Sequence, residues 1–202
     1  MLTIRRARRS DTATIFALIR GLAAYERLTH EVKASVARLR QHGFGRRRYF
    51  EALICQRDRR PIGFALYFFT YSTFVGRPSL YLEDLFVVPE QRGQGAGRML
   101  LRALARIAIE RGCGRMEWAV LHWNRPAIRF YERLGARLRR DWILTRLDGA
   151  ALQRVARRRW RGGPDRSEPL AMDGRTELLP SRPDNRSAHS SGNRRARPSP
   201  RI

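Results

Sequence analysis

A glycine-rich turn between a strand-like run and a helical run is the part of this sequence best suited to bind a phosphate group. Its glycines, at alternate positions, are Gly93, Gly95 and Gly97. Glycine lets the backbone turn tightly and bring several N–H groups toward one point. A helix predicted to begin at about Ala96 adds unpaired N–H groups and the positive end of its dipole. With the flanking charges of Arg92 and Arg98, the segment predicts a pyrophosphate site.

Two adjacent carboxylates, Glu83 and Asp84, interrupt the apolar run 80–88 just before this turn. Neighbouring residues of a strand point to opposite faces, so at least one of the two faces the interior or a cleft. A buried carboxylate is costly unless it is paired. The pair therefore indicates one of two things. It is either an ion pair with one of the many arginines, or a base or counter-charge for a cationic substrate beside the phosphate site.

A third set of candidate residues lies in the segment 123–136, which reads Trp-Asn-Arg-Pro-Ala-Ile-Arg-Phe-Tyr-Glu-Arg-Leu-Gly-Ala. Asn124 is suited to cap a helix that has Pro126 in its first turn and Gly135 just past its end. Tyr131 falls inside that helix, where a buried ring usually keeps its hydroxyl hydrogen-bonded. The residues alone leave open whether Asn124 is more than a cap and Tyr131 more than a core aromatic.

These segments belong to an alternation of strand-like and helical runs over residues 1–156. Strands are predicted at 2–7, 49–56, 62–70, 79–88, 116–121 and 137–147, and helices at 11–27, 32–41, 96–111, 148–156 and between Asn124 and Gly135. The glycine turn follows the fourth strand. A dinucleotide-binding unit would place such a turn after its first strand, so the position argues against one.

Arginine dominates the charge of the chain. There are 42 basic residues against 18 acids, a net charge of +24, and Lys33 is the only lysine. This usage resembles a coding bias more than selection for one partner. A basic surface favours nucleic acid, an anionic membrane or a phosphate-bearing cofactor. Because no helix-turn-helix, zinc-ligand or aromatic–basic pattern accompanies the charge, we do not expect specific nucleic-acid binding.

The rest of the composition predicts one domain with an appended tail in a cytoplasmic protein. The sequence contains no run of 18 apolar residues, so no membrane span is predicted. The two cysteines, Cys55 and Cys113, lie far apart in the sequence and suit a reducing compartment. Six of the ten prolines lie between positions 164 and 200, among Ser, Gly, Asn and Arg. We therefore expect a domain at 1–156 and a disordered, basic tail at 157–202.

The glycine turn, its acid-bearing strand and the 124–136 block resemble the GNAT superfamily of acetyl-CoA-dependent N-acetyltransferases. The similarity is closest to the diamine (spermidine/spermine) acetyltransferase branch. The segments 22–26, 63–71 and 80–84 carry the same resemblance, which covers residues 1–156. It implies a mixed α/β fold with a mostly antiparallel central sheet, splayed near the cofactor strand and covered by helices on both faces. It also implies a homodimer.

The resemblance further implies roles for individual residues. Tyr131 would protonate the leaving thiolate, and Glu83 would help to take a proton from the incoming amine. The substrate would be received by Tyr25, Glu26, Glu83, Asp84 and Asp141. Acetyl-CoA would be held by Leu85, Phe86, Val87, Arg92, Gly93, Gln94, Gly95, Ala96, Gly97, Arg98, Asn124, Arg125, Pro126 and Ala127. No metal is implied.

Two positions depart from the pattern of that branch. His122 stands before the Trp-Asn pair, where relatives tend to carry an acid, and near the C-terminal substrate wall only Asp141 keeps a negative charge, after two arginines. Both changes weaken the case for a long polyamine. We therefore expect acetylation of a primary amine of a small diamine or polyamine-like substrate. The alternative is an amino acid side chain (thialysine- or lysine-like) or another small cation, and a nucleic-acid-binding protein is a remote third.

Overall fold

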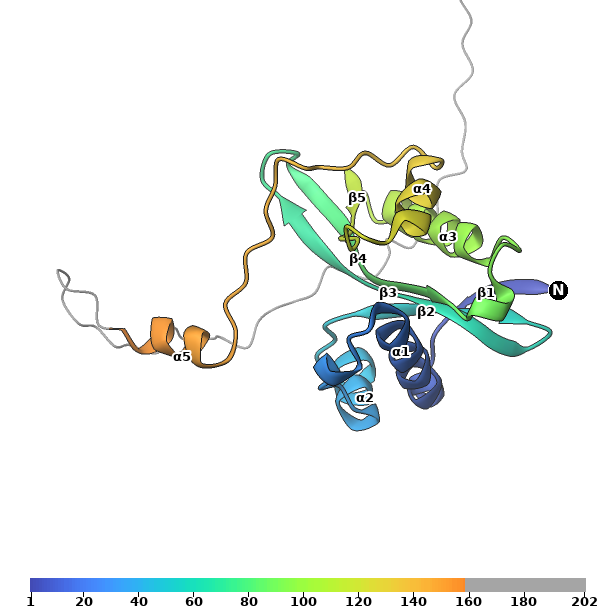
Figure 1. Cartoon of the computed structure of the whole chain (residues 1–202), viewed down its shortest axis with the longest axis horizontal. Coiled ribbons are helices and arrows are strands. Elements are labelled where there is room, and N and C mark those ends of the chain that lie inside the picture. Colours follow the sequence, from blue (N-terminus) through green and yellow to red (C-terminus); the bar gives the residue numbers. More distant parts are fainter. Residues whose placement is uncertain (159–202) are drawn as a thin grey trace, which may run out of the picture. The chain divides into compact units, whose positions relative to one another are not determined.

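The computed structural model describes residues 1–158 (Figure 1). Nearly all of the tail predicted to be disordered, residues 159–202, lies outside the described residues. The described part divides into a compact unit, Met1–Arg139, and a second unit that begins at Arg140. No helix within residues 1–158 is both long enough and apolar enough to cross a membrane.

One five-stranded sheet organises the first unit. Its strands are β1 (Leu2–Arg6), β2 (Glu51–Arg57), β3 (Arg60–Ser72), β4 (Arg77–Val87) and β5 (Arg115–Glu117). They lie in the order β1-β2-β3-β4-β5, with three antiparallel pairings followed by a parallel one between β4 and β5. The predicted mixed and mostly antiparallel sheet is confirmed.

Helices cover both faces of this sheet, as predicted (Figure 1). They are α1 (Thr12–Glu26), α2 (Val36–Phe44), α3 (Ala96–Glu110) and α4 (Arg125–Glu132), with 3-10 turns at Arg9–Asp11, Thr29–Glu31 and Pro89–Gln91; α5 (Gly149–Arg157) belongs to the second unit. The side of the sheet against which α1 and α2 pack is called the α1 face. The opposite side, which carries α3 and α4, is called the α3 face.

Each face has its own apolar core. On the α1 face, Ile15 and Leu18 of α1 pack with Phe64 and Leu66 of β3. On the α3 face, Leu100, Leu101, Leu104, Ile107 and Ala108 of α3 pack on the sheet, and these are the five residues that helical spacing predicted to be buried. Because both faces are covered, the middle of β3 is a continuous buried run, 62–67.

Two irregularities of β4 shape the region near the glycine turn. Strand β5 pairs with β4 only at residues 79–81, so the segment 82–87 has β3 on one side and no described strand on the other. This is the predicted splay. In addition, Leu66 pairs with Asp84 and Tyr67 with Leu82, which leaves Glu83 as the extra residue of a β-bulge.

Strand β5 is shorter than the strand predicted at 116–121. The strand predicted at 137–147 is wrong, because residues 137–148 contain no strand. The side chains of Trp142, Ile143 and Leu144 give this segment the composition of a strand, yet they are exposed. Composition alone does not make a strand: the backbone must also find a hydrogen-bonding partner. No described segment pairs with residues 137–147.

Candidate functional site

The glycine turn adopts a backbone that only glycine accommodates easily. Gly93 and Gly95 have φ angles of +75° and +87°, and a Cβ added at either would meet no heavy atom of residues 1–158 within 4 Å. The glycines are therefore needed for conformation rather than for space, and the volume beside them is open. At Gly97 a Cβ would lie 3.4 Å from the ring of Phe130, so the first turn of α3 approaches α4 closely.

The N-terminus of α3 fits the phosphate group of a cofactor. The helix begins at Ala96, as predicted, and no side chain of the described residues caps it. The first N–H groups of a helix have no intrahelical partner and carry its positive dipole end, which favours an anion. Gln94 and Arg98 are exposed on either side of Ala96. The open edge of β4 at 82–87 is joined to this glycine turn through the short 3-10 turn Pro89–Gln91.

Arg92 makes contacts that its sequence position does not suggest. Its Nε donates a hydrogen bond to the carbonyl oxygen of Val87 at 2.9 Å. Its guanidinium carbon lies 4.3 Å from the ring centroid of Tyr25 and 5.5 Å from that of Phe86. Arg92 therefore connects the end of β4 to the C-terminal turn of α1. Its predicted contact with the cofactor stays a prediction.

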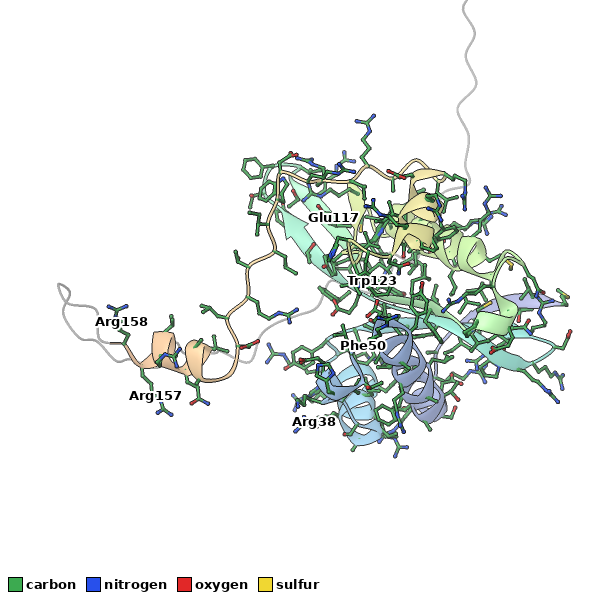
Figure 2. All side chains as sticks on the ribbon, in the orientation of Figure 1. Arg38, Phe50, Glu117, Trp123, Arg157 and Arg158 are labelled. Carbon is green, nitrogen blue, oxygen red and sulfur yellow. The ribbon has the colours of Figure 1, made fainter. Side chains whose placement is uncertain are left out.

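The ends of α1 and α4 meet although the two helices cover opposite faces of the sheet. The Tyr25 hydroxyl donates a hydrogen bond to Asn124 Oδ1 at 3.1 Å, and the same oxygen caps α4 by accepting from the backbone N–H of Ala127 at 3.3 Å. This contact crosses the sheet where β5 has separated from β4. Trp123, labelled in Figure 2, lies at this junction with its ring centroid 6.0 Å from that of Tyr25.

Tyr131 is buried on the inner side of α4, with 8% of its surface exposed. Its ring packs against Trp118 and Phe130, at centroid distances of 5.0 and 5.3 Å. Burial, and then the charge of Glu26, raises the pKa of the Tyr131 hydroxyl to about 12. The hydroxyl is therefore protonated at neutral pH, and it has no hydrogen-bond partner within residues 1–158. It is available to donate a proton.

The carboxylates of Glu26 and Glu83 both lie near that of Asp84, and Glu26 also lies near Tyr131. Burial, followed by the charges of Glu83 and Glu26, raises the pKa of the half-buried Asp84 to about 7. Burial also raises the pKa of Glu26. None of the three carboxylates makes an ion pair or a hydrogen bond with another described residue. The structural alternative for Glu83 and Asp84, an ion pair with an arginine, is therefore wrong within residues 1–158.

The remaining predicted site residues fall around these groups. Leu85 packs on the α3 face and Phe86 on the α1 face, while Arg125 and Pro126 are exposed in the first turn of α4. Asp141 belongs to the second unit, so its place in the site stays a prediction. Within residues 1–158 no group of three His, Cys, Asp or Glu side chains is arranged to hold a metal ion.

Two aromatic residues of this region escaped the sequence analysis. Trp118 packs on Tyr131, and Trp123 packs on Tyr25. The signal for Trp123 was its position directly before the cap residue Asn124, where a hydrophobic residue often packs and fixes the entry of the chain into the helix. Trp118 gave no comparable signal, because it lies in a segment that looked like ordinary strand.

Comparison with known proteins identifies similar sequences and folds. Residues 17–136 match the family model described as "Acetyltransferase (GNAT) family". The chain is 39% identical over 166 residues to the thialysine N-ε-acetyltransferase of Mus musculus, covering 77% of this chain and 97% of the relative. It is 36% identical over 140 residues to a spermidine/spermine N(1)-acetyltransferase-like protein of Homo sapiens, covering 66% of this chain and 20% of that protein.

A solved structure has the same fold. An integron cassette protein from the mobile metagenome of V. cholerae superposes with a TM-score of 0.66 at 26% identity, over 78% of this chain and 98% of that protein.

Proposed function

Because this chain belongs to the GNAT acetyltransferase family, in which acetyl transfer from acetyl-CoA to an amine is the shared activity, we propose a specific acceptor. The acceptor is the terminal primary amine of an amino acid side chain of lysine-like length. The enzyme is an N-acetyltransferase, and GNAT enzymes use acetyl-CoA as cosubstrate.

The cluster of Glu26, Glu83 and Asp84 is the observation that supports a cationic amine as the acceptor. Basic residues outnumber acids by more than two to one in this chain, yet no arginine pairs with these three carboxylates within residues 1–158. Glu26 and Asp84 are partly buried without a counter-charge from residues 1–158, which is costly in the free enzyme. A substrate ammonium would offset that cost, so the cluster supports a cationic amine as the acceptor.

An amino acid is better supported than the small diamine that the sequence first suggested. The mouse relative, which this chain matches over nearly its whole length, is named for thialysine, whereas the match to the spermidine/spermine-like protein covers a fifth of that protein. His122 stands where relatives of the diamine branch tend to carry an acid. An amino acid also brings an α-carboxylate, which suits a protein with this excess of arginine.

The geometry supports a direct transfer. The glycine turn and the N-terminus of α3 would hold the pyrophosphate, and the open edge of β4 would offer backbone groups to the pantetheine arm. Acetyl-CoA supplies a thioester carbonyl, which the neutral amine attacks so that an amide C–N bond replaces the C–S bond. The carboxylate cluster binds the ammonium and removes its proton. Tyr131 donates its proton to the departing sulfur, because its hydroxyl is protonated and has no hydrogen-bond partner within residues 1–158.

A thiol-release assay with matched amines tests the acceptor. Lysine and cadaverine have the same carbon chain and the same terminal amines, and they differ only in the α-carboxylate. We expect thialysine and lysine to be acetylated with a higher kcat/KM than cadaverine, putrescine or spermidine. A preference for cadaverine over lysine would overturn the amino acid proposal in favour of the diamine. No turnover with any of these amines would overturn both.

Two implications of the resemblance stay predictions. We expect a homodimer, which sedimentation equilibrium of the full chain would measure, and we expect the protein to act in the cytoplasm.

A further inference from the structure

The β-bulge at Glu83 decides which carboxylate of the adjacent pair points toward α1. Leu82 and Leu85 both lie on the α3 face, although an unbroken strand would place residues three apart on opposite faces. The bulge supplies the extra residue that makes this possible. As a result Asp84, directly opposite Leu66, shares the α1 face with Phe86.

This placement brings Asp84 among negative charges. Glu26 reaches it from the last turn of α1, and Glu83 reaches it from its own strand. The remaining neighbour across the ladder is the apolar side chain of Leu66, which is buried. No basic side chain from the described residues packed around Asp84 contributes to its titration. Glu83, by contrast, is exposed to solvent.

The two carboxylates of the pair therefore differ in their surroundings, because Asp84 is half-buried and Glu83 is exposed. Asp84 is partly desolvated and faces two like charges, and both effects favour its protonated form. An increase in pKa from 3.8 to about 7 is roughly a thousandfold increase in affinity for a proton. An ammonium with a pKa of about 10.4 gives up its proton more readily to the stronger acceptor.

We propose that Asp84, and not Glu83, accepts the proton that the substrate ammonium loses, with Glu26 and Glu83 acting as fixed negative charges that strengthen its affinity for that proton. The N–H bond of the ammonium breaks, an O–H bond forms on Asp84, and the freed lone pair attacks the thioester carbonyl. Asp84 later releases the proton to water. This inference rests on the proposed function, because it requires a primary amine as the acceptor.

The test is the pH dependence of kcat/KM for the best amine, measured between pH 5.5 and 9 on the full-length protein. Four variants are compared, each with a side chain of nearly the same shape as the one it replaces: Asp84→Asn, Glu83→Gln, Glu26→Gln and Glu110→Gln. Glu110 is exposed at the end of α3, far along the chain from the cluster, and serves as the charge-matched control. The dissociation constant of acetyl-CoA, measured by calorimetry, reports whether each variant is folded.

The wild-type profile is expected to rise through an inflection near pH 7, the value to which burial, Glu83 and Glu26 raise the pKa of Asp84. Asp84→Asn should remove that inflection and lower kcat by about a hundredfold or more, which is the usual size of a general-base contribution. Glu83→Gln and Glu26→Gln should keep the inflection and move it to lower pH, because each removes a charge that raises the pKa of Asp84. Glu110→Gln should leave the profile unchanged.

Two results would overturn the inference while leaving the proposed function standing. In the first, Asp84→Asn keeps the inflection and Glu83→Gln loses it, so that Glu83 is the proton acceptor. In the second, Asp84→Asn raises the KM of the amine but leaves kcat and the inflection intact, so that Asp84 only binds the ammonium. Failure of the wild-type enzyme to acetylate any amine would instead refute the proposed function.

Discussion

Replacing Arg92 by methionine separates two roles for this residue, a ligand of the cofactor phosphate and a connector between β4 and α1. Methionine keeps an unbranched, flexible side chain, although a shorter one than that of arginine, and removes the charge and all hydrogen-bond donors. The structure predicts that the variant loses the hydrogen bond to the Val87 carbonyl and the stacking on Tyr25 and Phe86. Arg98→Met is the matched control, because Arg98 flanks the same turn from the exposed surface of α3.

The size of the effect follows from these contacts. A cation–π contact at a partly exposed site contributes about 0.5–1 kcal/mol, and there are two of them. A hydrogen bond from a charged donor contributes about 1.5 kcal/mol or more. Since the terms are not additive, we expect Arg92→Met to lower the free energy of unfolding by about 2 kcal/mol. For a unit of this size that corresponds to a decrease in Tm of about 6 °C.

The loss of the Arg92 contacts should also weaken binding of the amine substrate. Tyr25 is followed by Glu26, so loosening the end of α1 displaces a member of the carboxylate cluster. We expect the KM of the amine to rise about tenfold, the equivalent of 1.4 kcal/mol, with a smaller change in the KM of acetyl-CoA. Thermal unfolding and steady-state kinetics with each substrate varied in turn measure both effects.

The control defines the refuting result. Arg98→Met should weaken acetyl-CoA binding without changing Tm. If Arg92→Met behaves in the same way, with unchanged stability and a raised KM for acetyl-CoA alone, then Arg92 binds phosphate and the connecting role argued from its contacts is wrong.

Three further predictions test other parts of the site. Tyr131→Phe should lower kcat about a hundredfold and leave the calorimetric affinity for acetyl-CoA nearly unchanged; lost affinity would show that the hydroxyl holds the cofactor. Gly95→Ala and Gly112→Ala both place a side chain at positive φ and should each cost about 1–2 kcal/mol of stability in urea unfolding, yet only Gly95→Ala should weaken acetyl-CoA binding. Asp84→Asn should stabilise the protein by up to about 4 kcal/mol at pH 8 but not at pH 4. The sign follows because the raised native pKa of Asp84 favours its protonated form, so stability is lost as pH rises through about 7. An equal change in stability of Asp84→Asn at both pH values would contradict this prediction. As the control, Glu110→Gln should change the stability at neither pH.

Local patterns predicted most of the elements correctly. The apolar residues of α3 recur at helical spacing, so the sequence alone predicted the buried face of that helix. The cap at Asn124 and the start of α3 at Ala96 were equally local, since each depends on residue types within one turn of the helix end. The strand predicted at 137–147 failed because pairing depends on a partner elsewhere in the chain, which composition does not supply.

The candidate site likewise has features that depend on local sequence and features that depend on tertiary contacts. The sequence by itself determined the glycine turn, the presence of adjacent acids at positions 83 and 84, and the tyrosine at 131, because these are residue types at short spacing. Only the tertiary structure decided how they face one another. The bulge that turns Asp84 to the α1 face exists through pairing with β3, and the meeting of Tyr25 with Asn124 depends on the separation of β5 from β4. Charges that shift a pKa act through space, so the arrangement of Glu26, Glu83 and Asp84 could be recognised only after α1 was packed on the sheet.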